Sequence, residues 1–217
     1  MPHLTPRPAA LLLDLDGTLV DSEPRHFEAH KRFLASVQMP VTHDDVVGNV
    51  GKGDLVFYRT LMERVGRTAD AAEWVRQKTE LLMTMYRTEG LDLCPGVKGL
   101  LAHAFDTGVF AHIVTSAERY LAALSLQVTG LDQRLPARIC HEDVVQHKPN
   151  PEPYLLAASR LSVPPERCLV IEDSISGVKS GRAAGCHVIG FVGIITGEDL
   201  LAAGAHRTVT TLDQVRW

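Results

Sequence analysis

Residues 10–21 read ALLLDLDGTLVD, a short apolar run that ends in two carboxylates, Asp14 and Asp16, followed at once by a glycine. About four to eight apolar residues closed by a turn signal are typical of a strand buried on both faces of a parallel sheet. In an open parallel α/β sheet the active crevice lies beyond the carboxyl ends of the strands. We therefore expect both carboxylates at that edge, although acidic residues at a solvated strand exit would give the same pattern.

The composition is that of an ordinary globular chain. Its 217 residues are 45% hydrophobic and 22% charged, with a formal net charge of −4, which allows one core and a smaller second domain. There is no Lys/Arg-rich run, so we expect neither a nucleic-acid nor a membrane partner. No apolar run approaches the roughly 18 residues of a membrane span, and residues 1–8 lack the apolar segment of a signal peptide. Four scattered cysteines fit a reducing compartment, and together these features predict a cytoplasmic protein.

A long helical segment follows the first strand. A crossover between parallel strands needs only about a dozen residues, yet the next apolar strand pattern lies at 110–114. Apolar residues recur at helical spacing in three intervening segments, for example at Phe57, Tyr58, Leu61 and Met62. We expect an α-helical cap domain over residues 20–92, inserted into a core made of residues 1–19 and 93–217, and placed to act as a lid.

Strands and helices alternate after Pro95. Strands are predicted at 110–114, 137–140, 168–171 and 187–192 and around Val209, and helices at 97–105, 118–128, 151–161 and 176–184. This alternation favours a parallel sheet covered on both faces, which is a Rossmann-like α/β core. Every strand-to-helix junction in such a core opens on the same edge of the sheet.

Those junctions carry residues suited to phosphoryl transfer. Ser116 offers a hydroxyl followed by free helix amides, which fits either an anion site or an ordinary helix cap. Lys148 lies in a proline-rich loop and is either a phosphate-neutralising group or a solvated charge. Glu172 and Asp173 end another apolar strand, and with Asp14 they make a set of hard oxygen ligands that suits Mg²⁺.

The chemistry of these side chains predicts a two-step reaction. Asp14 can attack phosphorus and form an aspartyl-phosphate, which divides one difficult displacement into two easier ones. Asp16 can protonate the leaving oxygen and then activate water. Mg²⁺ and Lys148 would stabilise the charge on the phosphoryl oxygens.

In order along the chain, DLDGT at 14–18, Ser116, the KPNP sequence at 148–151 and EDSISG at 172–177 resemble the four motifs of the haloacid dehalogenase-like superfamily. The resemblance implies a Rossmann-like core with Asp14 as nucleophile and Asp16 as general acid/base. The second Asp of the first motif favours phosphate chemistry over dehalogenation. The implied Mg²⁺ ligands are Asp14, the main-chain oxygen of Asp16, Glu172 and Asp173, and the implied phosphoryl-binding residues are Ser116, Ala117 and Lys148.

Within the superfamily the helical insert is similar to the cap of the β-phosphoglucomutase-like subgroup. That resemblance implies substrate contacts at His26, Gly51, Lys52 and Lys78. A half-buried histidine and solvated lysines without any ligand would fit the same positions. Lys52 stands where the mutase has an arginine, and Thr18 stands where it has an apolar residue, so both departures favour a phosphatase.

The sequence therefore predicts a Mg²⁺-dependent phosphatase of small phosphorylated metabolites, sugar or polyol phosphates first, which is monomeric by analogy. The alternative enzyme is a sugar phosphomutase of the β-phosphoglucomutase kind. A non-catalytic relative that binds a phosphorylated ligand is a less favoured alternative. The presence of all four predicted catalytic and metal-binding residues, Asp14, Asp16, Lys148 and Asp173, argues against it.

Overall fold

The chain is described by a computed structural model over residues 7–42, 45–46, 53–136 and 138–217. It divides into two compact units. The first, here called the core unit, comprises Met1–Asp21 and Asp92–Trp217, and the second, here called the helical unit, comprises Ser22–Leu91.

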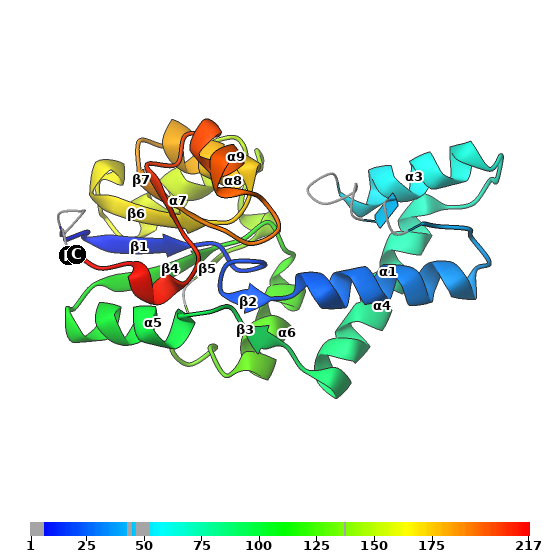
Figure 1. The fold of residues 1–217 in the computed structure, drawn as a ribbon, viewed down its shortest axis with the longest axis horizontal. Helices are drawn as coiled ribbons and strands as arrows, with labels where there is room; N and C mark the ends of the chain where they lie inside the picture. The colour runs from blue at the N-terminus through cyan, green and yellow to red at the C-terminus, as the bar shows by residue number, and fades with distance from the viewer. Residues whose placement is uncertain (1–6, 43–44, 47–52, 137) are drawn as a thin grey trace. The chain divides into compact units, whose positions relative to one another are not determined.

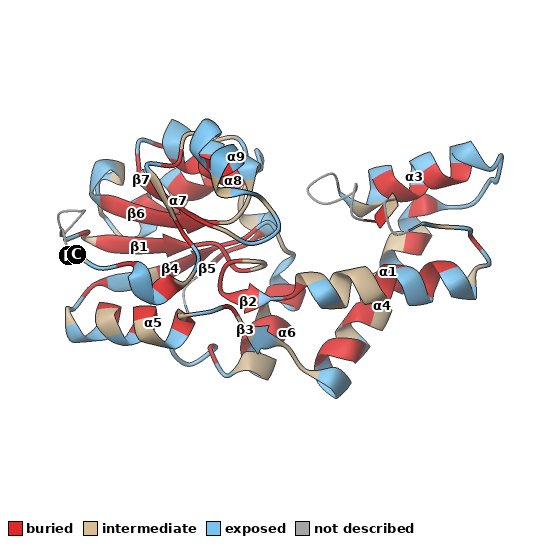
Figure 2. Ribbon diagram, in the orientation of Figure 1, coloured by how far each residue is buried: buried red, intermediate tan, exposed pale blue. Residues whose placement is uncertain are grey.

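The core unit is built on a six-stranded parallel sheet (Figure 1). Its strands, in spatial order, are β5 (Arg138–Ile139), β4 (Phe110–Val114), β1 (Ala10–Leu13), β6 (Cys168–Glu172), β7 (His187–Phe191) and β8 (Arg207–Val209). All four residues of β1 are completely buried, because the strand has neighbours on both sides and helices over both faces (Figure 2). The observed architecture confirms the predicted Rossmann-like α/β core.

Helices cover both faces of this sheet. They are α5 (Val97–Asp106), α6 (Arg119–Thr129), α7 (Glu152–Arg160), α8 (Ile175–Ala183) and α9 (Gly197–Ala202), with 3₁₀ turns η1 (His141–Asp143), η2 (Pro165–Arg167) and η3 (Leu212–Gln214). In Figure 1, α7, α8 and α9 lie on one face and α5 and α6 on the other. Gly181 of α8 allows close packing, because a Cβ there would lie 3.0 Å from Val188 and 3.1 Å from Val170.

The two connections between the units lie side by side in the core unit. Strands β2 (Val20–Asp21) and β3 (Asp92–Leu93) form an antiparallel pair in which Val20 faces Leu93. The amide of Cys94 also donates to the carbonyl of Leu19 at 3.0 Å. These strands were not predicted, because two residues are too few for an apolar alternation to be recognised.

The helical unit contains α1 (Glu23–Ser36), α3 (Asp54–Arg64) and α4 (Ala71–Glu89). Its core is aromatic: the rings of Phe33, Tyr58 and Trp74 meet edge to face with centroids 5.5–5.8 Å apart. Asp70 begins α4 by accepting the amide of Ala72 at 2.9 Å. The predicted helical character of this insert is confirmed. Within the described ranges, no helix combines the length and apolarity that a membrane span requires.

Candidate active site

The register of the central strands brings two of the predicted acidic residues to the same position along the strand direction, at the carboxyl edge of the sheet. Leu13 of β1 pairs with Ile113 of β4 on one side and with Ile171 of β6 on the other. The residues that follow, Asp14 and Glu172, therefore leave the sheet at the same edge. Asp14 is only 7% exposed and Glu172 is fully buried, so two carboxylates are held away from water.

Lys148 joins these carboxylates. Its ammonium donates to Asp14 Oδ1 at 2.7 Å, to Glu172 Oε1 at 2.6 Å and to the carbonyl of Val114 at 2.8 Å. An ammonium has three donors, and all three are used. Burial alone would lower the pKa of Lys148, but the charges of Asp14 and Glu172 raise that pKa above its ordinary value. Lys148 is thus a buried cation of the site and not a solvated surface charge.

Glu172 is fixed by three further donors. The hydroxyl of Tyr154 donates to its Oε1 at 2.8 Å, and the amide and hydroxyl of Ser174 donate to its Oε2 at 3.2 and 2.9 Å. The Ser174 hydroxyl in turn accepts the amide of Gly177 at 3.0 Å and so begins α8. A Cβ on Gly177 would occupy the space of the Glu172 carboxylate. The glycine of the EDSISG segment is therefore required by the glutamate that begins it.

Asp173 has a similar relation to the first motif. It accepts the hydroxyl of Thr18 at 3.0 Å, and a Cβ on Gly17 would collide with its carboxylate. Gly17 also has a φ of +76°, a conformation that favours glycine. Burial raises the pKa of Asp173 well above its usual range, and the charges of Asp14 and Glu172 raise it further.

The three carboxylates form a group that fits a divalent cation. Asp14, Glu172 and Asp173 each offer one ligand atom, and these atoms lie within 4.8 Å of one another. Burial raises the pKa of Asp14 to about 7, and the nearby Glu172 charge adds to the shift while Lys148 opposes it. Three acids around one ammonium leave an excess of negative charge, which a hard oxygen-binding ion would neutralise. Because Glu172 already accepts from three side chains, Asp14 and Asp173 have the more open oxygens.

Asp16 lies in the turn that follows Asp14. The turn is closed by the amide of Gly17, which donates to the carbonyl of Val20 at 2.8 Å. Asp16 is half-buried, and its charge contributes to the raised pKa of Asp14, so the two side chains are near each other. Its carboxylate is not a member of the three-acid group, and the role expected for its main-chain oxygen stays a prediction.

The predicted phosphoryl-binding loop follows β4. Ser116 is exposed, two residues beyond the carbonyl that accepts Lys148. The amide of Ala117 donates to the hydroxyl of Thr115 at 3.0 Å, and its carbonyl accepts the amide of His141 at 3.0 Å. These contacts fix the loop, with the exposed Ser116, at the same edge as the acids.

In the helical unit the structure brings two of the predicted substrate residues together. The ammonium of Lys78 lies 3.1 Å from His26 Nδ1 and donates to Asp54 Oδ2 at 2.9 Å. Lys78 is 1% exposed, which excludes the interpretation of a solvated helix lysine. Gly51 and Lys52, the other two predicted contacts, lie outside the described residues.

Asp54 extends this cluster. It lies 3.4 Å from His30 Nε2, and His30 Nδ1 is 2.9 Å from the hydroxyl of Tyr58. Burial lowers the pKa of His26 to about 3, and the Lys78 charge adds to this shift, so its imidazole is neutral and Nδ1 can accept from Lys78. Neither Asp54 nor His30 was predicted as a site residue, although His30 follows His26 by four residues and so lies on the same face of its helix.

The fold and the acidic cluster are those of an α/β enzyme whose carboxyl edge can hold a divalent cation. A family model for haloacid dehalogenase-like hydrolases matches residues 11–191. The chain therefore belongs to the haloacid dehalogenase-like hydrolases. Solved structures of similar fold include a putative β-phosphoglucomutase from Thermotoga maritima, with a TM-score of 0.81 at 30% identity over 94% of this chain and 95% of its own, in agreement with the resemblance of the sequence motifs.

The similar proteins include phosphatases of carbohydrate derivatives. Hexitol phosphatase A of Escherichia coli K12 is 36% identical over 182 residues, which cover 82% of this chain and 80% of that protein. A phosphorylated carbohydrates phosphatase of Thermotoga maritima is 32% identical over 90% of this chain and 91% of its own. The structure of a HAD hydrolase of family IA, variant 3, from Entamoeba histolytica superposes with a TM-score of 0.85 at 25% identity and covers 95% of both chains. These named phosphatases are phosphoric monoester hydrolases.

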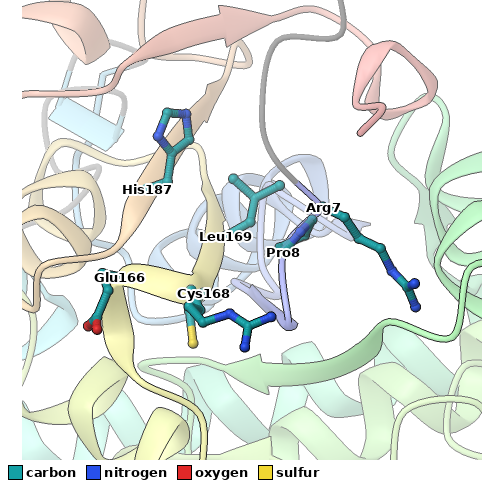
Figure 3. A pocket seen from close by; sticks show the side chains of 7 residues that line it. Arg7, Pro8, Glu166, Cys168, Leu169 and His187 are labelled. Carbon is teal, nitrogen blue, oxygen red and sulfur yellow. The ribbon is translucent and has the colours of Figure 1, made fainter.

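A separate cavity lies at the opposite ends of the strands. Its volume is about 350 Å³, and Figure 3 shows the side chains around it. They come from the residues that begin β1, β6 and β7, namely Arg7, Pro8, residues 166–169 and His187. None of these residues belongs to the acidic cluster.

The Gly177→Ala variant tests the fit between α8 and the glutamate. We expect a loss of about 1–3 kcal/mol in the free energy of unfolding, because the new methyl group must displace the Glu172 carboxylate. Gly99→Ala is the helical control, since its Cβ would lie 3.2 Å from one side-chain atom, Asp213 Cβ. Urea unfolding measures both, and equal stability of the two variants would contradict the packing argument.

The Asp14→Asn variant tests the electrostatics of the site. The pKa of Asp14 is raised to about 7 in the folded protein and is near 3.8 in the unfolded chain, so only the folded state keeps this proton between those pH values. The free energy of unfolding of the metal-free enzyme therefore falls, through this group, as pH rises from about 4 to 7. We expect Asp14→Asn to be more stable than the wild type by about 1–3 kcal/mol at pH 8.

The stability advantage of Asp14→Asn over the wild type should shrink at pH 5. It should reverse with saturating Mg²⁺, because the ion stabilises only the intact carboxylate site. Urea titrations at both pH values, with chelator or with Mg²⁺, measure it. Asp21→Asn is the control, since Asp21 is an exposed acid on β2. If the variant is less stable than the wild type at pH 8 in chelator, the buried ionised carboxylate of Asp14 does not destabilise the folded protein.

The Tyr154→Phe variant tests whether this buried hydroxyl positions Glu172. The change removes the bond to Oε1 and keeps the ring, whose centroid lies 5.2 Å from the Lys148 ammonium. We expect a loss of about 1.5–3 kcal/mol in stability, as for other hydrogen bonds to a charged group, and weaker Mg²⁺ binding. Tyr120→Phe is the control, because Tyr120 is an exposed residue of α6. Calorimetric Mg²⁺ titration gives the readout, and unchanged Mg²⁺ affinity would contradict the positioning role.

Proposed function

We propose that this protein is a Mg²⁺-dependent phosphatase of small sugar or polyol phosphates that acts through an aspartyl-phosphate at Asp14. The observation that carries the proposal is the buried cluster in which Lys148 bridges Asp14 and Glu172 beside Asp173. The similarity to a hexitol phosphatase and to a phosphorylated carbohydrates phosphatase supports the substrate class.

In this proposal Asp14 is the nucleophile. Lys148 binds one of its oxygens, Oδ1, which orients the carboxylate and leaves Oδ2 for attack on phosphorus. A bound Mg²⁺, held mainly by Asp14 and Asp173, would keep the nucleophile ionised and neutralise charge on the phosphoryl group. The Ser116 hydroxyl would bind a phosphoryl oxygen. The positive charge of Lys148, whose three donors are already used, would stabilise the negative charge on the phosphoryl group.

Asp16 is the proposed general acid and base. Protonated, it would give its proton to the leaving alkoxide when Asp14 is phosphorylated. The resulting carboxylate would then remove a proton from the water that attacks the aspartyl-phosphate and releases inorganic phosphate. Its place two residues beyond the nucleophile, on a turn closed by Gly17 and Val20, supports this role.

The helical unit is proposed to recognise the rest of the substrate through His26 and Lys78. Asp54 already neutralises Lys78, so this cluster presents donors and an acceptor without excess charge. Such a set suits hydroxyl groups, which both donate and accept, better than a second phosphate. Among the described residues this favours a polyol monophosphate over the bisphosphate of a mutase.

The direct test is phosphate release from a panel of hexitol, ketose and aldose monophosphates with Mg²⁺ and with chelator. We expect turnover of a few members, none with chelator, and none by Asp14→Asn. A parallel arm contains β-glucose 1-phosphate with glucose 1,6-bisphosphate. Formation of glucose 6-phosphate without free phosphate would contradict the phosphatase and establish the mutase.

Asp16→Asn separates the two steps. It should form the aspartyl-phosphate slowly and hydrolyse it slowly, with a loss of about 10²–10⁴ in kcat. Rapid-quench measurement of the phosphorylated protein checks this expectation, and normal hydrolysis of the intermediate would exclude Asp16 as the base.

A further inference from the structure

A basic groove lies at the β5 edge of the sheet, apart from the acidic cluster. Its volume is about 470 Å³, within the range of small-molecule sites. It is lined by side chains from four elements of the core unit: His112 of β4, Arg119 of α6, Arg160 at the end of α7, and Arg138, which begins β5; Pro136 and Leu161 complete the lining.

The charge of this groove is opposite to that of the whole chain. Three arginines line it, whereas the chain has a formal net charge of −4. Asp143 balances only part of this charge: it accepts from Arg119 at 2.5 Å and from Arg160 at 3.0 Å. Because field lines concentrate in a concave surface lined by one sign of charge, small anions are attracted to it.

Arg138 has unused hydrogen-bonding capacity. Its Nη1 is buried, and no partner for it exists among the described residues. Most buried polar atoms in folded proteins have a partner, and a guanidinium left without one is costly. Arg138 also lines the groove, so an oxyanion bound there would be an acceptor for this guanidinium, and oxyanions are the groups that arginine binds best.

We propose that this groove is a second binding site, for a small metabolite with an oxyanion head group, held by Arg138 and Arg160 with Arg119 at its rim. It is distinct from the substrate site, because none of its lining residues belongs to the acidic cluster or to the phosphoryl-binding loop. It stands independently of the proposed phosphatase activity.

The groove is connected to the phosphoryl-binding loop by short contacts. Asp143, which binds Arg119 and Arg160, also accepts the amide of Cys140 at 2.8 Å. The next residue, His141, donates its amide to the carbonyl of Ala117 at 3.0 Å. An anion that competes with Asp143 for these arginines therefore acts on the segment that fixes the loop of Ser116.

Sulfate is the first probe, because it is an oxyanion that a phosphatase does not hydrolyse. Titration of the full-length Mg²⁺-loaded protein by calorimetry should give saturable binding that Arg138→Gln and Arg160→Gln each weaken about tenfold. Arg134→Gln is the matched control, since this exposed arginine lies four residues from Arg138 and does not line the groove. Arg160 is 46% exposed, so its substitution does not endanger folding.

Ser116→Ala identifies the competing site. If sulfate binds only at the substrate site, Ser116→Ala weakens it while Arg138→Gln and Arg160→Gln leave the affinity unchanged, and the proposal is overturned. If both arginine variants weaken a binding event that Ser116→Ala leaves intact, the proposal holds. A parallel titration with malonate then shows which head group the site prefers. Tighter binding of malonate than of sulfate through the same arginines indicates a carboxylate, and the reverse indicates a tetrahedral oxyanion.

Discussion

The ion pairs of Lys148 are the interaction on which the functional edge depends. A single ammonium donates to Asp14, to Glu172 and to a strand carbonyl, so three segments distant in sequence meet at one atom. Buried carboxylates are tolerated only when they are paired and hydrogen-bonded, and this lysine supplies the pairing for two of them. Removing it would leave uncompensated charge in the interior, so the same contact serves folding and chemistry.

Shape imposes a second constraint on this edge. The carboxylates of Glu172 and Asp173 occupy the positions that side chains of Gly177 and Gly17 would take. Each acid therefore requires a glycine elsewhere in the chain. The motifs are consequently short stretches in which acids, glycines and capping hydroxyls occur together, because the glycines leave free the space that the carboxylates occupy.

Much of this architecture was predictable from local patterns. The apolar run before Asp14 indicated a buried central strand, and the alternation after Pro95 indicated the parallel sheet whose carboxyl edge collects the junctions. What could not be predicted depends on packing between distant segments. Nothing in the sequence near Tyr154 shows that its hydroxyl reaches Glu172, and the short pair β2–β3 has no periodicity to detect. The Asp54 and His30 contacts arise only when α1, α3 and α4 pack together.

The polar groups of the molecule differ in charge balance, and that difference fits different ligands. The cluster of Asp14, Glu172 and Asp173 has more acids than Lys148 can neutralise, which suits a cation together with a transferring phosphoryl group. In the helical unit one acid, Asp54, faces one lysine, and such a balanced set suits neutral hydroxyls. A buried site with a net charge binds a ligand of opposite charge that neutralises it. A buried site without net charge binds a neutral ligand that forms hydrogen bonds with its polar groups. The sugar or polyol phosphate that we propose as the substrate class combines both chemistries in one small molecule.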